Sequence, residues 1–179
     1  MAGGEVLVPG RALADGAQFA AALLGAGLPA EAARHVREAG IAYADDELAE
    51  AHLRAAAALA PGHPAVLIAH YRYSFYKGRL LDALRLARVC ISEAARVNRL
   101  HADWRRVRAG DADFGSYDAL LPRFYLFSLK AYAYLQLRLG RVAEGRDAAR
   151  TLLELDPSDK IGARVLLDVL AAAAGSGDE

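Results

Sequence analysis

Two stretches of this chain share one pattern of glycines and small residues, and this pattern limits the possible folds more than any other feature. The segment YRYSFYKGRLLDALRLA aligns with AYAYLQLRLGRVAEGRDAA, and in both a glycine separates two helical patterns. The small residues after that glycine lie where two packed helices approach closely. A repeated helix pair of this kind predicts a stacked solenoid. The aligned positions are Gly78 with Gly140, Ala83 with Gly145, and Ala87 with Ala149.

Apolar residues recur at intervals of three and four along most of the sequence, and alternating strand-like runs are almost absent. This periodicity predicts an all-α fold. Glycines and prolines interrupt the periodic segments and mark the helix ends. The predicted helices cover 12–25, 29–42, 46–60, 64–77, 80–97, 118–139, 142–155 and 160–173.

The spacing resembles the tetratricopeptide repeat (TPR) family, whose unit is a helix pair of about 34 residues with a turn glycine and a closing proline. Pro61 and Pro157, the latter in LLELDPSDK, stand at the closing position, and Ala95 occupies it one such period after Pro61. The resemblance implies a right-handed α-α superhelix. The first unit also permits a register in which Gly27 is the turn glycine and 12–40 forms the pair. The predicted division is an N-terminal extension and helix at 1–29, repeat units at 30–63, 64–97 and 126–159, an extension with an aromatic and acidic loop at 98–125, and a capping helix and tail at 160–179.

The third unit comes late, because the distance from Ala95 to Pro157 is nearly twice the family period. The delay contains HADWRRVRAGDADFGSYDALLP, which holds the only tryptophan of the chain. Its first half has helical spacing. It either continues the preceding helix or, if Asn98 ends that helix, forms a short new one capped by Asp103. Its aromatic side chains either fill the space between units two and three or contact a ligand at one end of a groove. These side chains are Trp104, Phe114 and Tyr117.

No arrangement of catalytic or metal-binding residues is visible in the sequence. The single cysteine, Cys90, excludes an internal disulfide and a multi-cysteine metal site, and its apolar neighbours predict a packing role. The five histidines lack the spacing of three or four residues that places two ligands on one helical face. We therefore expect a protein that is not an enzyme, with no cofactor and no bound metal.

Charge and hydropathy restrict the class of partner. The 22 basic and 22 acidic residues balance, so no overall field attracts nucleic acid or an anionic membrane. The most apolar early run, Phe19–Leu28, lacks a basic leader, and no run approaches the ~18 apolar residues of a membrane span. We expect a cytoplasmic protein that binds another protein or a peptide, and neither nucleic acid nor a membrane.

The TPR resemblance implies that the first helices of the units line a concave groove. Cations among aromatic rings in such a groove suit a carboxylate or an acidic peptide. This is similar to the carboxylate-clamp members of the family, although Arg72 and Tyr134 stand where the clamp has paired asparagines. Alternatively, some groove aromatics only pack between helices. The predicted groove residues are Arg34, Arg72, Phe75, Tyr76, Lys130, Tyr134 and Arg138, with Ile68, Phe127, His35 and Glu38 at further inward positions.

These features favour a non-enzymatic adaptor or co-chaperone that holds an extended or acidic segment of a partner. A structural subunit that uses the same surface, for example in a homodimer, is an alternative. The three units are similar to type III secretion chaperones, which lack an excursion like the one at 98–125. The stretch ADWRRVRAGDADFGSYDALLPRFYLFSLKAY, with GARVLLDVL, is similar to small bacterial repeat proteins that accompany nitrogen-fixation genes. An enzyme would have to combine His70, Tyr73 and Asp111.

Overall fold

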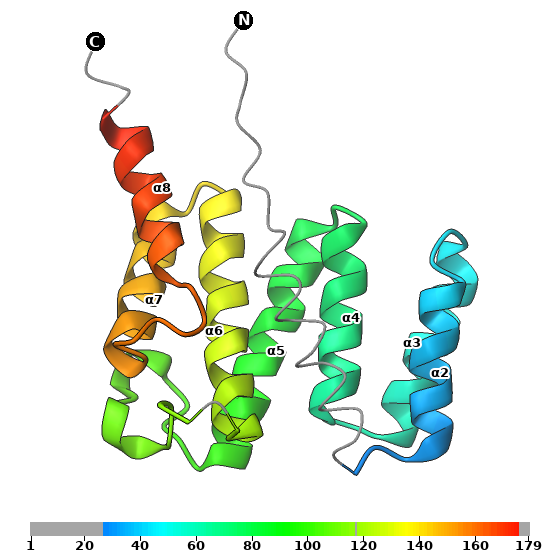
Figure 1. The fold of residues 1–179 in the computed structure, drawn as a ribbon. Coiled ribbons are helices and arrows are strands. Elements are labelled where there is room, and N and C mark those ends of the chain that lie inside the picture. The colour runs from blue at the N-terminus through cyan, green and yellow to red at the C-terminus, as the bar shows by residue number, and fades with distance from the viewer. Residues whose placement is uncertain (1–26, 117, 176–179) are drawn as a thin grey trace, which may run out of the picture.

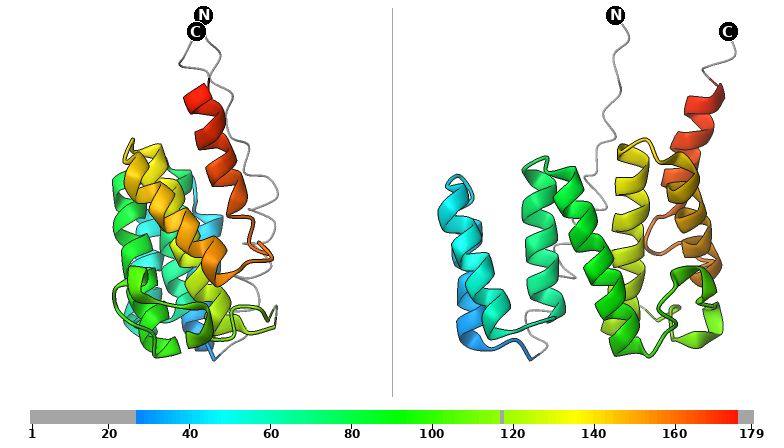
Figure 2. Two further views of the ribbon diagram at one scale, coloured as in Figure 1. Left: turned by 90° about the vertical axis from the view of Figure 1, so that its left-hand side faces the viewer. Right: turned by 180° about the vertical axis from the view of Figure 1, so that it is seen from behind.

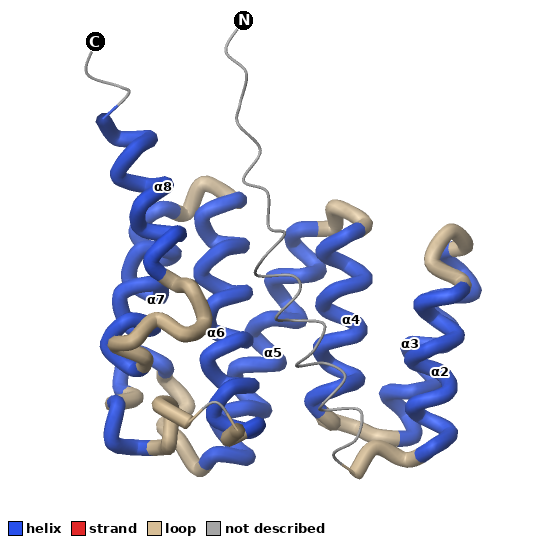
Figure 3. Tube along the Cα trace, in the orientation of Figure 1, coloured by secondary structure: helices blue, strands red, loops and turns tan. Residues whose placement is uncertain are grey.

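The computed structural model describes residues 27–116 and 118–175, and this part of the chain contains seven α-helices and no strand (Figures 1 and 3). The helices lie side by side in a row of antiparallel neighbours (Figure 1). The all-α prediction is confirmed, while the helix predicted over 12–25 lies outside the described residues. None of these seven helices combines the length and the apolar character needed to cross a bilayer. They are α2 (Ala30–Ile41), α3 (Asp46–Leu59), α4 (Pro64–Tyr76), α5 (Leu80–Asn98), α6 (Leu120–Arg138), α7 (Val142–Leu155) and α8 (Arg164–Gly175).

The turns after α4 and α6 have the same hydrogen bonds, as the alignment of Gly78 with Gly140 predicts. Both glycines have positive φ, 71° and 75°, a conformation that glycine adopts without steric cost. In each turn the two N–H groups that follow the helix bond back to its last carbonyl oxygens, which is the Schellman arrangement. The bonds are Gly78 N–H to Phe75 O (3.0 Å) with Arg79 N–H to Ser74 O (2.9 Å), and Gly140 N–H to Leu137 O (3.0 Å) with Arg141 N–H to Gln136 O (2.8 Å).

The small positions of the repeat are the places where paired helices touch. Ala83, Ala87 and Ala149 are buried, and at Gly145 there is no room even for a methyl group. A Cβ atom added there would lie 2.5 Å from a methyl carbon of Leu137 and 2.9 Å from the backbone oxygen of Ala133. Glycine at this position therefore sets how closely α7 packs on α6.

Polar side chains cap the N-termini of α3 and α4. Asp45 accepts a hydrogen bond from the backbone N–H of Leu48 (3.0 Å) and so caps α3. His63 accepts from the backbone N–H of Ala65 (3.2 Å), and Pro64 stands in the first turn of α4, where its missing N–H costs nothing. The polar residues that interrupt the apolar pattern thus satisfy helix ends.

The buried side chains form one large cluster and two small ones. The large cluster runs through α4 to α8 and includes Phe124, Tyr125 and Leu129, each of which is fully buried. The small clusters lie around α2 and α3 and consist mostly of alanines. One contains Ala32, Ala56, Ala60 and Val66, and the other contains Ala39, Ala49, Leu53 and Tyr73.

The excursion between α5 and α6 is a compact loop at one end of α6 and α7 (Figures 1 and 2). Asn98 is the last residue of α5, and Arg99 follows in the left-handed conformation with φ 56°. Asp103 then caps the short 3-10 turn η1 (Trp104–Arg106), and η2 (Ala109–Asp111) follows. The structure therefore selects the alternative in which Asn98 ends the helix. The other alternative, in which α5 continues through the first half of the excursion, is wrong.

Aromatic side chains of this loop fill the core. Trp104 is 7% exposed and lies 6.2 Å, centroid to centroid, from the ring of Tyr132, and Phe114 is 3% exposed and lies 5.9 Å from Tyr125. Both loop residues belong to the large cluster. The hypothesis that Trp104 and Phe114 contact a ligand is wrong, because both rings are buried against α6. Tyr117, the third residue of that hypothesis, lies outside the described residues.

The last helix begins at Arg164, four residues after the predicted start at Lys160. Asp159 has positive φ (51°), and its carboxylate accepts the backbone N–H groups of Ala163 and Arg164. Asp156 is buried and accepts the N–H of Ile161 (3.2 Å). These two carboxylates hold residues 156–163 as a turn, because they take the donors that an earlier helix would have used.

Candidate functional site

Five of the predicted groove residues meet on α4 and α6 and form what we call the aromatic–arginine strip: Arg72, Phe75, Tyr76, Tyr134 and Arg138. The ring of Phe75 lies 5.5 Å from Tyr76 on its own helix and 5.7 Å from Tyr134 on α6. Arg72 lies over Tyr76, with 5.8 Å between its guanidinium carbon and the ring centroid. Arg138 lies over Tyr134 at 5.7 Å and donates a hydrogen bond to its hydroxyl oxygen (2.7 Å). Phe75 thus joins two cation–π pairs into one surface.

The repeat explains this arrangement. Because Gly78 corresponds to Gly140, Arg72 corresponds to Tyr134, and Tyr76 corresponds to Arg138. Each helix therefore carries an arginine and a tyrosine four residues apart, on one face, in opposite order. The strip has a guanidinium group at each end and three aromatic rings between them.

The strip is partly open to solvent, and its two arginine side chains have no acidic partner among the described residues. Tyr76 is 42% exposed, and Phe75 and Tyr134 are half-buried against the large cluster. Among the described residues no carboxylate pairs with Arg72 or Arg138. An arginine without a counterion beside an exposed ring can form charge-assisted hydrogen bonds with an incoming carboxylate.

Two other predicted groove residues make their polar contacts elsewhere. Lys130 lies one turn before Tyr134 on α6, and its Nζ donates to the backbone oxygen of Ile161 (2.5 Å) in the α7–α8 connection. Arg34 is exposed on α2 and pairs with Glu31 of the same helix (3.8 Å). No contact within the described ranges joins Arg34 to the strip.

The further inward positions also differ from the expectation. Ile68 is 1% exposed and belongs to the core, so it does not line a groove. Phe127 is half-buried and packs against the same core. His35 is directed at a neighbouring helix, where its ring meets that of His52. Glu38 lies half-buried on α2, and no contact of the described residues brings it to the strip.

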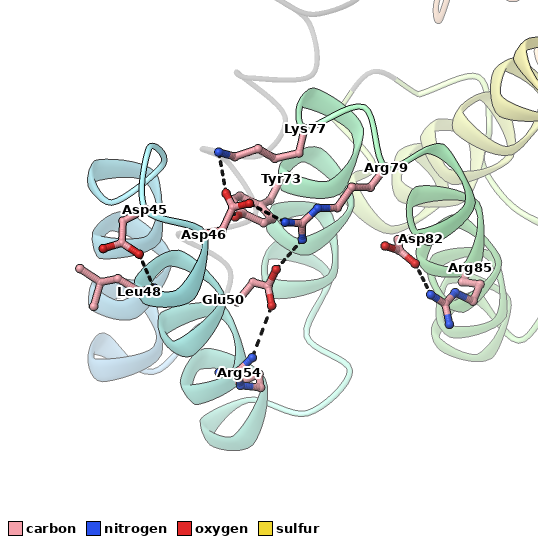
Figure 4. Close-up of polar contacts among 10 residues, drawn as sticks. All are labelled: Asp45, Asp46, Leu48, Glu50, Arg54, Tyr73, Lys77, Arg79, Asp82 and Arg85. Atoms are coloured by element: carbon pink, nitrogen blue, oxygen red, sulfur yellow. Dashed lines mark hydrogen bonds and ion pairs between the residues drawn. The ribbon is translucent and has the colours of Figure 1, made fainter.

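The interface between α3 and α4 holds a network of charged groups (Figure 4). Asp46 accepts hydrogen bonds from Lys77 (2.7 Å), Arg79 (2.6 Å) and the hydroxyl of Tyr73 (2.8 Å). The bonds from Lys77 and Tyr73 hold the pKa of Asp46 below its ordinary value. Burial, together with the bond to Asp46, raises the pKa of Tyr73 to about 12. Arg79 also pairs with Glu50, so the charges of this network compensate one another.

A surface hollow of about 410 Å³ lies beside this network, between α3 and α5. His70 and Ser74 line it from the side of α4 opposite Arg72, because two residues of helix turn the side chain by about 200°. Tyr73 also lines the hollow, but Asp111 accepts the backbone N–H of Arg108 in the excursion instead (2.8 Å). Among the described residues no contact joins Asp111 to His70 or Tyr73, so the structure adds no support to the enzyme hypothesis based on these three residues.

Cys90 packs inside the large cluster. Its thiol is 3% exposed, and burial raises its pKa to about 12. A thiol with a raised pKa is not ionised near neutrality and is a poor nucleophile. The predicted packing role agrees with this position.

The sequence did not reveal the contact between His35 and His52. Their Nδ1 atoms are 2.9 Å apart, although 17 residues separate them in the chain. Spacing within one helix cannot detect such a pair, because the two residues lie on α2 and α3 and meet only when the hairpin closes. The Asp46 network escaped detection for the same reason.

The chain is similar in sequence to a protein of about the same length. No family model matches the chain, and no solved structure matches it. The "Uncharacterized 19.8 kDa protein in nifW 5'region" of Azotobacter chroococcum mcd 1 is 40% identical over 124 residues, which are 69% of this chain and 70% of that protein. This identity and coverage place the two in one family. The chain thus belongs to the family of the 19.8 kDa protein in the nifW 5' region of Azotobacter chroococcum.

Proposed function

We propose that this protein is a non-enzymatic interaction module that binds an extended acidic segment of a partner protein on the aromatic–arginine strip. The proposal rests on the surroundings of the Arg72 and Arg138 guanidinium groups. Both rest on tyrosine rings, and neither has a carboxylate partner in the described part of the chain. Acidic side chains or a C-terminal carboxylate would supply the missing charges, and apolar side chains would cover the rings.

The proposed architecture is a right-handed superhelix of the tetratricopeptide type. It is supported by the matching turns at Gly78 and Gly140 and by the small residues at Ala83 and Gly145. In such an array the first helices of successive units face the same groove. This would place α4 and α6, and with them the strip, on the concave surface.

A peptide array followed by fluorescence anisotropy tests the proposal. Short acidic segments that contain an apolar residue should bind, and raised salt should weaken binding because the contacts are ionic. Changing Arg72→Ala together with Arg138→Ala should lower the affinity by about a hundredfold or more, since each of the two charge-assisted hydrogen bonds contributes ~1.5–3 kcal/mol.

The matched control is Arg85→Ala. Arg85 is exposed on α5, pairs with Asp82 and lines the hollow on the other side of α4. This variant should bind the same peptides as the unchanged protein. Equal affinity for the double variant and the unchanged protein would contradict the proposed site.

A second proposal rests on the relative. Because a protein of this family is described by its place in the nifW 5' region, we infer an accessory role associated with nitrogen fixation. Deletion of the gene in a nitrogen-fixing host should slow growth on dinitrogen and leave growth on ammonium unchanged. Equal growth on both nitrogen sources would exclude the role.

The outer face of α8 favours self-association as an alternative use of the fold. The last helix of a solenoid normally carries a polar outer face, yet Val165 is 48% exposed and Val169 is 38% exposed. Light scattering at two concentrations should show a dimer that Val165→Glu with Val169→Glu converts to a monomer. A monomer at both concentrations without these changes would remove this alternative.

A further inference from the structure

One pair of side chains outside the strip is brought together by the fold with a geometry suited to a ligand. His35 on α2 and His52 on α3 are both half-buried, and their Nδ1 atoms are 2.9 Å apart. The ring centroids are 5.2 Å apart and the ring planes are inclined by 42°. The distance between the ring centroids is longer than the distance between the Nδ1 atoms by about two ring radii. Each Nδ1 atom therefore lies on the side of its ring that faces the other ring.

This contact is a hydrogen bond in which one proton lies between the two Nδ1 atoms. At 2.9 Å one ring donates its Nδ1–H and the other accepts with its Nδ1 lone pair. If the donating ring takes the tautomer with its proton on Nε2, both Nδ1 lone pairs face the same point. The change of tautomer needs no oxidant and no net loss of protons from the neutral pair. A cation that prefers imidazole can then take the place of the proton.

We propose that His35 and His52 form a two-imidazole site for a divalent transition-metal ion of the class represented by Zn²⁺ and Ni²⁺. These ions bind neutral imidazole nitrogen, with zinc–nitrogen bonds of about 2.0–2.1 Å. Two such bonds at a tetrahedral angle need about 3.3 Å between the nitrogen atoms, a few tenths of an ångström more than the observed 2.9 Å. Each ring must also turn by roughly 35°, because the two Nδ1 lone pairs now lie along the line between the nitrogen atoms and a tetrahedral metal ion lies off that line. The proposed site therefore forms only after a change in the side-chain torsions of both histidines.

Water would complete the coordination shell. Within the described residues no group of three histidine, cysteine, aspartate or glutamate side chains is placed to hold a metal ion, so we assign two ligands from this part of the chain. Structural zinc sites have four protein ligands and catalytic sites three. The proposed site therefore binds more weakly than either and fills according to the concentration of the metal.

Metal binding would connect α2 and α3 across a hairpin whose buried clusters consist mostly of small side chains. The small cluster near these histidines consists mainly of Ala32, Ala56 and Ala60, which bury little apolar surface. A ligand that binds the folded hairpin and not the unfolded chain stabilises the hairpin by mass action. The site would thus make the order of α2 and α3 depend on the concentration of the metal.

Zinc chloride alone is the probe for the test. Calorimetric titration of the full chain should show one site, and zinc at about ten times its Kd should raise the unfolding midpoint by about 3–6 °C. Hydrogen exchange should slow in α2 and α3. His35→Gln and His52→Gln should each abolish both effects, because one imidazole is left.

The control is His101→Asn. His101 is exposed and accepts the N–H of Asp103 (2.9 Å), a bond that asparagine can also accept, so this variant should respond to zinc as the unchanged protein does. X-ray absorption at the zinc edge gives a second measurement on the unchanged protein and should count two imidazole ligands. No response of the unchanged protein, an equal response of the glutamine variants, or fewer than two imidazoles would each overturn the proposal.

Discussion

The interface of α3 with α4 and the interface of α5 with α6 join neighbouring helix pairs by different means. Between α5 and α6, and onward to α8, large side chains such as Phe124 and Leu129 form a single core. Around α2 and α3, alanines form two small clusters, and the charged groups around Asp46 connect these helices to α4. Apolar burial stabilises in proportion to area, and partly exposed ion pairs contribute little. We infer that the α2–α3 hairpin opens more easily than the rest of the chain.

A matched pair of leucines gives the largest expected effect on this comparison. Leu129→Ala, at a fully buried site of the large cluster, should cost about 3–5 kcal/mol of global stability, because a cavity remains there. Leu53→Ala, in a small cluster, should cost about 2 kcal/mol and act mainly on α2 and α3. Urea unfolding measures the first change and hydrogen exchange measures where the second acts. Equal loss of protection across both regions in both variants would contradict the comparison.

A pair of glycines should move stability in opposite directions. Gly145→Ala should destabilise by about 1–3 kcal/mol, because its methyl group meets Leu137 and the backbone oxygen of Ala133. Gly40→Ala in α2 should stabilise by about 0.5–1 kcal/mol, since nothing lies within 4 Å of the new carbon and alanine favours helix. Thermal unfolding of both variants checks the signs. A loss of stability in the Gly40 variant would show that α2 is more closely packed than the structure indicates.

Two buried tyrosines sharpen the contrast between polar and apolar packing. The hydroxyl of Tyr73 donates to Asp46, so Tyr73→Phe should destabilise the α3–α4 interface by about 1 kcal/mol. The hydroxyl of Tyr125 is buried without a hydrogen-bond partner among the described residues, and burial raises its pKa. Tyr125→Phe should therefore be neutral or stabilising by up to about 1 kcal/mol. Chemical denaturation compares the two, and a clear loss from Tyr125→Phe would indicate an unrecognised partner.

The response to pH should be the smallest effect and should be confined to the charged interface. The pKa of Asp46 is lower in the folded protein than in the unfolded chain, so folding is favoured while the carboxylate is ionised. This contribution is complete above the unfolded pKa of about 4 and disappears as the pH falls through the lower folded value. Hydrogen exchange in α3 should accelerate over that range. Asp46→Asn should remove this part of the pH dependence, and an unchanged profile in that variant would contradict the assignment.

The helices could be predicted from the sequence because their ends depend on local chemistry. The turn at Gly78 needs a positive φ, and the start of α3 needs the carboxylate of Asp45, and both signals lie within a few residues of the element they end or begin. The predicted start of α8 is too early, because Asp156 and Asp159 bond to several donors in a turn that periodicity does not reveal. The same limit applies to Asn98, which ends α5 against an apolar spacing that continues.

The residues of the candidate site can be predicted where they lie at equivalent positions of the two aligned helices, α4 and α6. Arg72 and Tyr134 are identified because the alignment of the two glycines carries one helix face onto another. The ring contact between Phe75 and Tyr134 confirms that α4 and α6 bring these residues together. Lys130 lies one turn from Tyr134 on α6, but its Nζ donates to the backbone oxygen of Ile161. This partner could not be predicted, because it depends on the turn formed by residues 156–163. The contact of His35 with His52 depends entirely on how two helices dock.

The loop between α5 and α6 also has a consequence for the order of folding. Most neighbouring helices contact one another soon after they are made, because few residues separate them. Besides its aromatic contacts with α6, the loop is held by Arg105 on Glu144, 39 residues apart, and by Lys160 on the backbone oxygen of Gly115, 45 residues apart. Contacts between distant residues form slowly, since a long segment of chain must close first. During synthesis these two polar contacts would therefore form only after α7 and the following turn had left the ribosome, later than the aromatic contacts of the loop with α6.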